Sequence, residues 1–348
     1  MSQGAFASFL ARKDIEISPQ RYAIDALSAM AQGLFASLLI GTILATVGDL
    51  TGIAFFNEVG SFAKSVAGPA MAIAIGYALK TPPLVLFSLA AVGYAANAAG
   101  GAGGPLAVLV VAIVASECGK AVSKETKVDI LATPAVTILA GCGLSIAVSP
   151  AIGALASSVG GFIMWATELQ PFFMGVIVSV VIGIALTLPI SSAAICAALS
   201  LTGLAGGAAV AGCCAQMVGF AVMSFKENSW GGLVSQGLGT SMLQMGNIVR
   251  KPIIWLPPIL ASAITGPIAT CVFQLQQNGS AIASGMGTCG LVGPIGALAM
   301  AGAPAAGPLD WLGLALICFI LPALLSWGIC TGMRKAGLIK DGDLKLEA

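Results

Sequence analysis

Charged residues are scarce in this sequence. Of its 348 residues, 15 are Lys or Arg and 14 are Asp or Glu, so charged residues make up 8% of the chain, against about 25% in an ordinary soluble domain. Hydrophobic residues make up 58%, and 45 glycines add further positions without a polar side chain. So few charges cannot cover a surface that faces water, which excludes a soluble globular protein. The net charge of +1 offers no basic surface for phosphates, so we expect no nucleic-acid partner.

Histidine is absent altogether. This excludes a His-containing catalytic triad, the usual His ligands of a catalytic metal, and a phosphohistidine intermediate on this chain. The nine cysteines form no C-x-x-C pair, and nearly all lie in apolar segments, where a thiol behaves as a small hydrophobe. The chain also has no G-x-x-x-x-G-K-[ST] loop for nucleotide phosphates. We therefore expect no catalytic residue, no metal site and no cofactor.

Long uncharged windows lie between the charged residues. An ionised side chain at the centre of a bilayer costs at least about 2.5 kcal/mol, and one spanning helix needs about 20 residues. The windows 169–225 and 252–309 are therefore long enough for two or more membrane segments each. This pattern predicts an all-α polytopic membrane protein with about eight to ten transmembrane helices. The uncharged windows are 26–48, 65–79, 81–116, 130–167, 169–225, 228–249, 252–309 and 311–333.

The positions of Lys and Arg predict the orientation of the chain, because short loops rich in these residues stay in the cytoplasm. Basic residues lie near both termini and in three middle loops, so both termini are expected to be cytoplasmic. Residues 1–20 then form a cytoplasmic amphipathic lead at the inner surface. Residues 21–333 form the membrane-embedded domain, and residues 334–348 form a cytoplasmic tail.

Four polar or glycine-rich segments interrupt the apolar stretches. Non-helical backbone at membrane depth is tolerated only where protein or a water-filled cavity satisfies it, and transporters place their substrate sites at such breaks. We therefore expect broken or re-entrant helical hairpins there. The alternative is that the glycines only serve close helix crossing. The four segments are Leu188–Ser192, Ala211–Gln216, Gln236–Asn247 and Gly285–Pro294.

The polar side chains expected inside the membrane are almost all neutral. Amides and hydroxyls donate and accept hydrogen bonds without charge, so they suit a neutral polyhydroxylated solute such as a sugar or polyol better than an ion. Glu117 is the one carboxylate included, and its alternative role is a pairing with Lys120, three residues further on. The predicted substrate-binding residues are Ser191, Ser192, Gln216, Gln244, Asn247, Thr288 and Glu117.

Several stretches resemble a family of bacterial membrane proteins, the IIC subunits of the sugar phosphotransferase system, some of which are named toxin-regulator-like. The resemblance extends from about Ile17 to Met333. The stretches that carry it are Ile17–Tyr22, Ala31–Gly41, Glu117–Lys127, Leu186–Ile195, Ala215–Ser224 and Gly285–Gly296.

The resemblance implies a permease that carries a sugar across the bacterial plasma (inner) membrane while a separate IIB protein phosphorylates it. It also implies a homodimer with an elevator architecture, in which a transport part moves against a scaffold. Phosphorylation by another chain accounts for the missing ion-coupling carboxylates and the missing histidine.

Two other functions stay open from the sequence. The chain could be a passive carrier or channel for another small polar solute, with no coupling to phosphorylation. It could also be a membrane-bound sensor or regulator that transports little.

Overall fold

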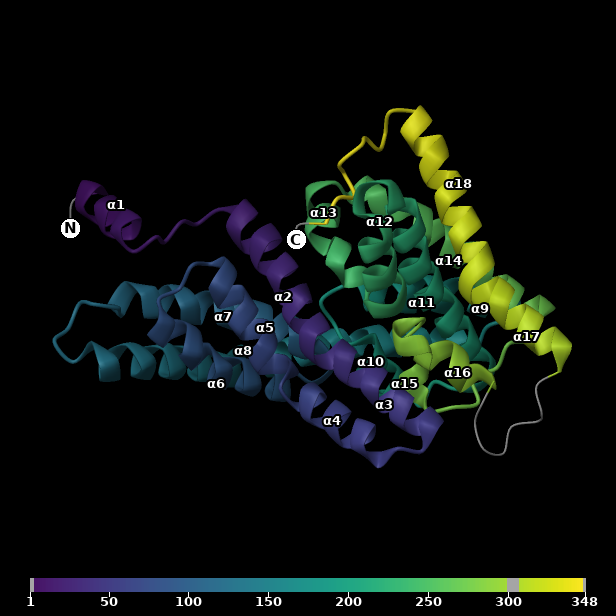
Figure 1. Ribbon diagram of the computed structural model, residues 1–348, viewed down its shortest axis with the longest axis horizontal. Coiled ribbons are helices and arrows are strands. Elements are labelled where there is room, and N and C mark those ends of the chain that lie inside the picture. Colours follow the sequence, from purple (N-terminus) through teal and green to yellow (C-terminus); the bar gives the residue numbers. More distant parts are fainter. Residues whose placement is uncertain (1–2, 299–306, 347–348) are drawn as a thin grey trace. The chain divides into compact units, whose positions relative to one another are not determined.

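The computed structural model describes residues 3–298 and 307–346. Within these ranges the chain is helical, and its one strand-like pairing is an isolated bridge between Gly203 and Gln277. This confirms the all-α fold class. The chain divides into two compact units, residues 1–38 with 62–155 and residues 39–61 with 156–348, which are described separately below (Figure 1).

The first unit is built from four main helices, α2, α5, α6 and α7, and from the first part of α8. α6 and α7 form a hairpin that turns at Gly101, whose backbone has a φ of 50°. Gly68 of α5 and Gly93 of α6 bring these two helices into backbone contact, as small residues do in membrane proteins. The bounds are α1 Gln3–Arg12, α2 Ala26–Leu34, α5 Ala67–Ala78, α6 Pro83–Gly100, α7 Gly104–Val122 and α8 Asp129–Thr167.

The second unit is centred on α11, which is buried along nearly its whole length. α9, α14 and α18 pack around it. Short helices and turns connect these long ones and carry the irregular segments. The bounds are α3 Ile40–Thr51, α4 Ala54–Ser65, α9 Pro171–Thr187, α10 Ser192–Ala198, α11 Gly203–Met223, α12 Phe225–Val234, α13 Met245–Arg250, α14 Leu256–Pro267, α15 Ala281–Ser284, α16 Val292–Leu298, α17 Pro308–Ala315 and α18 Leu321–Lys335.

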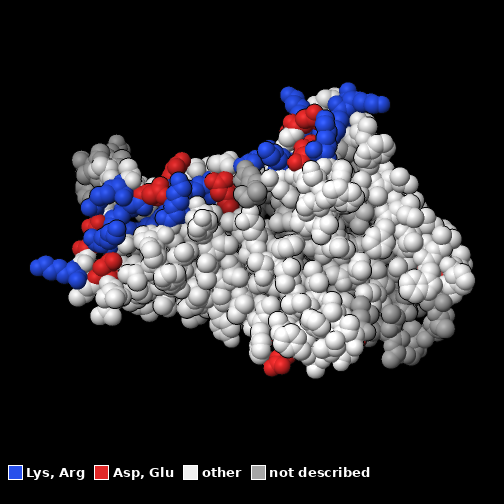
Figure 2. Space-filling view, in the orientation of Figure 1, with Lys and Arg blue, Asp and Glu red and all other residues white. Residues whose placement is uncertain are grey.

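Six helices among the described residues are long and apolar enough to cross a membrane, or seven if the bent pair α4–α5 is one span. One of the six, Pro83–Val122, contains both arms of the α6–α7 hairpin. The helix α9 is apolar but shorter. Counting both arms and α9 brings the number into the expected range of eight to ten. In Figure 2 most of the charged side chains in view lie in groups, one acidic group lies apart from them at the lower edge, and most of the remaining surface is uncharged.

Three of the four predicted breaks are confirmed. The chain leaves the helix at Leu188, at Thr240, and at Gly287 and Gly290, which both have a φ of 52°. The fourth prediction, a break at Ala211–Gln216, is wrong because these residues lie inside the continuous helix α11. Gly212 there serves close helix crossing, as the alternative interpretation held: its Cα faces the backbone of Ser179 on α9.

We predict that Gly212→Ala destabilises the protein. A Cβ at this position would overlap the carbonyl group of Ser179, and neither backbone can move away without disturbing a buried helix pair. Overpacking of this kind costs about 1–3 kcal/mol, which should lower the melting temperature of the detergent-purified protein. Gly328→Ala on α18 is the matched control, because its Cβ would meet open space. Equal melting temperatures for the two variants would contradict the close crossing of α9 and α11.

Candidate functional site

The predicted residue Gln216 lies at the centre of a buried polar group. Its Oε1 accepts hydrogen bonds from Trp255 Nε1 at 2.8 Å and from Thr187 Oγ1 at 3.3 Å, and its Nε2 donates to Ser262 Oγ at 3.4 Å. The hydroxyl groups of Thr187 and Ser241 lie 2.7 Å apart. We call Thr187, Gln216, Ser241, Trp255 and Ser262 the deep cluster.

The deep cluster joins four separate parts of the chain. Thr187 ends α9 at the first break, Gln216 lies in the middle of α11, and Ser241 lies in the irregular segment after α12. Trp255 and Ser262 lie on the turn before α14 and on α14 itself. Sequence reasoning found only Gln216 among these five. The nearness of Thr187 and Ser241 to helix breaks was a usable signal, but nothing marked Trp255 or Ser262.

The deep cluster contains no ionised side chain. Thr187, Gln216, Ser241 and Ser262 are fully buried, and their hydrogen bonds go to one another, to the Trp255 indole and to backbone carbonyls such as Gly212 O. Buried amides and hydroxyls that are satisfied in this way cost little, whereas an unpaired one costs about 1–3 kcal/mol. The deep cluster is therefore a set of neutral donors and acceptors that satisfy one another in the buried interior.

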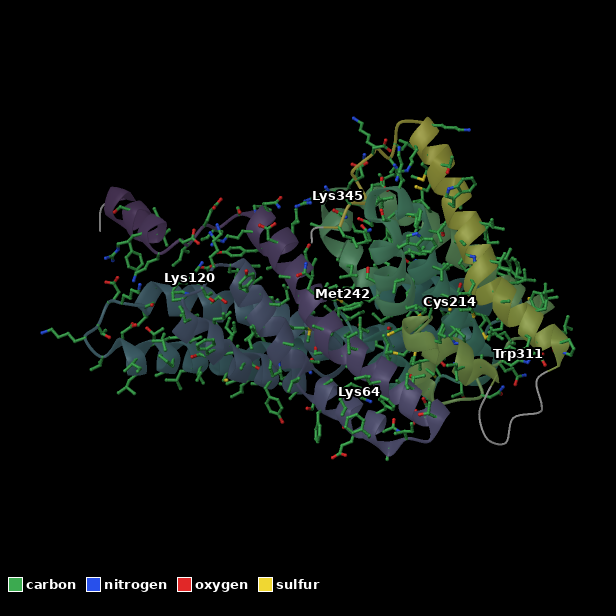
Figure 3. All side chains as sticks on the ribbon, viewed as in Figure 1. Lys64, Lys120, Cys214, Met242, Trp311 and Lys345 are labelled. Carbon is green, nitrogen blue, oxygen red and sulfur yellow. The ribbon has the colours of Figure 1, made fainter. Side chains whose placement is uncertain are left out.

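The predicted residues Gln244 and Asn247 lie in a second polar group, where they bind the C-terminal tail. Gln244 Nε2 donates to Leu344 O at 3.0 Å, and Asn247 Nδ2 donates to Lys345 O at 2.9 Å. Asn228 holds the tail from both sides, because its Nδ2 donates to Leu344 O and its Oδ1 accepts from Leu346 N. Figure 3 shows Lys345 beside α13, which carries Asn247.

A chain of amides supports these contacts. Asn247 Nδ2 donates to Gln244 Oε1 at 2.8 Å, and Gln244 Nε2 donates to Gln236 Oε1 at 2.9 Å. Gln236 Nε2 in turn donates to Ser224 Oγ at 2.9 Å. We call Asn228, Gln236, Gln244 and Asn247 the tail cluster.

Ion pairs fasten the tail next to this cluster. Asp343 lies 2.6 Å from Lys251 Nζ, and Asp341 lies 2.7 Å from both Lys226 Nζ and Arg334 Nη1. Burial raises the pKa of Asp343, but the hydrogen bonds from Lys251 and from the Lys340 amide lower it by more, so its pKa lies below the ordinary value. The hydrogen bond and charge of Lys226 lower the pKa of Asp341 as well. Both carboxylates are therefore ionised at neutral pH and hold the tail electrostatically.

One short turn connects the two clusters. The turn Ser241–Gln244 is a single 3-10 turn, introduced by Thr240, whose hydroxyl accepts a hydrogen bond from Met242 N. Its first residue belongs to the deep cluster and its last to the tail cluster. A movement of this turn therefore changes both clusters at once.

The remaining predicted residues of the second unit stabilise the breaks themselves. Ser191 caps α10 by accepting a hydrogen bond from Ala194 N, and Ser192 Oγ donates to Gly285 O at 2.7 Å. Thr288 donates to Gly237 O. All three bind neighbouring backbone, Thr288 also contacts Met217 Sδ at 3.6 Å, and none of them is hydrogen-bonded to Gln216 or Gln244.

Glu117 lies in the first unit and pairs with Lys120, as its alternative role held. Its Oε2 lies 3.1 Å from Lys120 Nζ, which also donates to Asp14 O at 2.8 Å. No hydrogen bond or ion pair of the described structure joins Glu117 to the other six predicted residues. The seven residues are thus divided among the deep cluster, the tail cluster, the breaks and a pair in the other unit.

Comparison with known families addresses what such a membrane protein does. The sequence model of the family described as "Phosphotransferase system, EIIC" matches residues 24–346. The chain belongs to this family. It is therefore a permease subunit of a phosphotransferase system and a multi-pass membrane protein. Searches among curated proteins and among solved structures found no match.

The range matched by the EIIC family contains both clusters. It includes Leu344, Lys345 and Leu346, whose backbone binds the tail cluster, and it begins after the lead of residues 1–20. The docked tail is therefore part of the family domain of this EIIC protein.

We predict that Leu344→Asp releases the tail. The Leu344 side chain is completely buried, and a carboxylate there would be desolvated without a partner, which costs several kcal/mol. The expected result is rapid proteolysis at the Lys340 and Lys345 bonds together with a lower melting temperature. Leu338→Asp is the matched control, since Leu338 is 50% exposed in the same tail. A tail that resists protease equally in both variants would contradict the docking.

Proposed function

We propose that this EIIC protein moves a neutral sugar or polyol across the bacterial inner membrane and that a separate IIB protein phosphorylates it at the cytoplasmic face. The deep cluster carries the proposal. It gathers neutral donors and acceptors together with an indole in the buried interior of the second unit, where an ion would find no charge to balance its own. Amide and hydroxyl groups can replace one another as partners of sugar hydroxyls.

The composition supports a separate phosphoryl donor. These 348 residues include no histidine, so a phosphoryl group carried on imidazole has to come from outside them. Phosphorylation of the arriving sugar would prevent its return and would supply the energy that no ion-coupling carboxylate of the deep cluster provides. In this proposal both termini are cytoplasmic, and a IIB protein approaches from that side.

We also propose how the clusters take part in transport. The deep cluster binds the sugar, and the turn Ser241–Gln244 passes the resulting movement to the tail cluster. The lead of residues 1–20, the membrane domain of residues 21–333 and the tail of residues 334–348 are then the functional parts. We further propose a homodimer with an elevator motion; the division of the chain into two compact units supports the motion of one part against the other.

We expect Gln216→Ala to weaken sugar binding about tenfold or more. The change removes an acceptor and a donor, and a hydrogen bond lost in a buried site is worth about 1–3 kcal/mol. The measurement is the affinity of the purified protein for a panel of neutral sugars and polyols, together with uptake of the labelled solute by cells. Gln276→Ala is the control, because Gln276 is exposed.

Two outcomes would contradict the proposal separately. Unchanged affinity in both Gln216→Ala and Ser241→Ala would remove the deep cluster as the sugar site. Accumulation of unphosphorylated solute in proteoliposomes without any partner protein would show a passive carrier instead of a phosphotransferase permease.

A further inference from the structure

A cavity in the first unit is not used by the proposed sugar transport. It has a volume of about 400 Å³ and lies at the connection between α5 and α6 and at the C-terminal end of α7. Five cationic side chains line it, but only two carboxylates do, Asp14 and Glu125. The cations are Arg12, Lys13, Lys80, Lys120 and Lys124. The cavity therefore carries an excess of positive charge.

The two carboxylates are already engaged. Glu125 Oε1 forms ion pairs with Arg12 and Lys13 at 2.8 and 2.5 Å, and Asp14 Oδ2 lies 2.6 Å from Arg21 Nη2. The hydrogen bond from Arg21 lowers the pKa of Asp14, and the hydrogen bond from Lys13 lowers that of Glu125. Both are ionised at neutral pH, yet neither is paired with Lys80 or Lys124.

Lys80 and Lys124 line the cavity without an ion-pair partner among the described residues, and their charges attract Asp14 and Asp129 only at longer range. Neither ammonium group forms a hydrogen bond or an ion pair with any part of the chain that the structure describes. Lysines near helix C-termini can serve the helix dipole alone. That explanation does not cover this cavity, because Arg12 and Lys13 also line it and come from the N-terminal segment, more than 100 residues before Lys120 and Ser123. Two hydrogen bonds hold this segment in place: Lys13 donates to Ser123 O, and Lys120 donates to Asp14 O.

Three helices end beside the cavity. Asp14, Lys80 and Lys124 follow the ends of α1, α5 and α7 and have φ values of 53°, 56° and 62°. This is the left-handed conformation in which many helices end, and the backbone hydrogen bonds of Ile15 N to Leu10 O and of Thr81 N to Gly76 O close two of these helix ends. All three residues line the same cavity.

We propose that this cavity binds a phosphate-bearing group. A phosphate offers three strong acceptor oxygens and at least one negative charge, which matches two free ammonium groups beside three paired cations. Two sources have this chemistry: the headgroup of an anionic phospholipid, and a free phosphate ester or phosphate ion. Basic pockets at the cytoplasmic ends of membrane helices are suited to the first. Figure 3 places Lys120 at this end of the first unit.

The test uses the purified full-length protein and two kinds of probe. One arm measures the melting temperature and lipid retention in native mass spectrometry with phosphatidylglycerol, compared with phosphatidylcholine. The other arm uses inorganic phosphate and glucose 6-phosphate, compared with chloride at equal ionic strength. Stabilisation by phosphatidylglycerol alone identifies the lipid source, and stabilisation by the soluble phosphates identifies the free source.

Variants assign the effect to the cavity. Lys80→Gln with Lys124→Gln should weaken binding of the effective probe about tenfold or more, since each removes one charge next to the anion. Lys124→Gln alone, which leaves the Lys80 backbone untouched, should give a smaller loss in the same direction. Lys127→Gln is the matched control, an exposed lysine of the same loop that does not line the cavity. The proposal fails if no probe stabilises the protein, or if the double variant binds as well as the control.

Discussion

The broken segments of the structure depend on one constraint: irregular backbone inside the membrane has to find polar partners within the chain. The two breaks after α9 and before α16 show how this is met. Gly203 and Gln277 exchange both backbone hydrogen bonds at 2.9 Å, Ser192 Oγ donates to Gly285 O, and Ser284 Oγ donates to Leu201 O. Each broken segment thus satisfies the other. Irregular backbone is tolerated at membrane depth here because the two broken segments hydrogen-bond to each other.

The fold class and most of the breaks could be predicted because they follow from local composition. Charge-free windows indicated the membrane segments, and glycine and proline with hydroxyl residues indicated the breaks at Leu188 and Gly287. The same reasoning failed at Ala211–Gln216. There a Gly-Cys-Cys stretch that looks weak in isolation is helical, because neighbouring helices approach it so closely that only small side chains fit. Packing of this kind is a property of partners far away in the sequence.

The sequence predicted which kinds of side chain lie in the interior, but not which of them lie together. Neutral amides in the interior pointed to Gln216, Gln244 and Asn247, yet the structure places Gln216 in one cluster and the other two in another. The reason is the tail. In the tail, the partners of Gln244 and Asn247 are backbone carbonyls 100 and 98 residues away. Every residue has such a carbonyl, so the residue types do not indicate which ones bind the amides. A tail of ordinary composition could not be recognised as a ligand of the amides from the sequence.

The tail distinguishes the two clusters, because its described residues bind the amides of the tail cluster and not those of the deep cluster. Its carbonyls occupy amide groups of the kind that would bind sugar hydroxyls, and its acidic side chains are held by Lys226, Lys251 and Arg334. The turn Ser241–Gln244 connects this occupied surface to the deep cluster. In the proposed function, a sugar that leaves Gln216 toward the cytoplasm must then compete with the tail or displace it. Gln244 Nε2 also donates to Gln236 Oε1, and Asn247 Nδ2 also donates to Gln244 Oε1. Both amides would therefore keep a hydrogen-bond partner if the tail were displaced, which lowers the cost of displacing it.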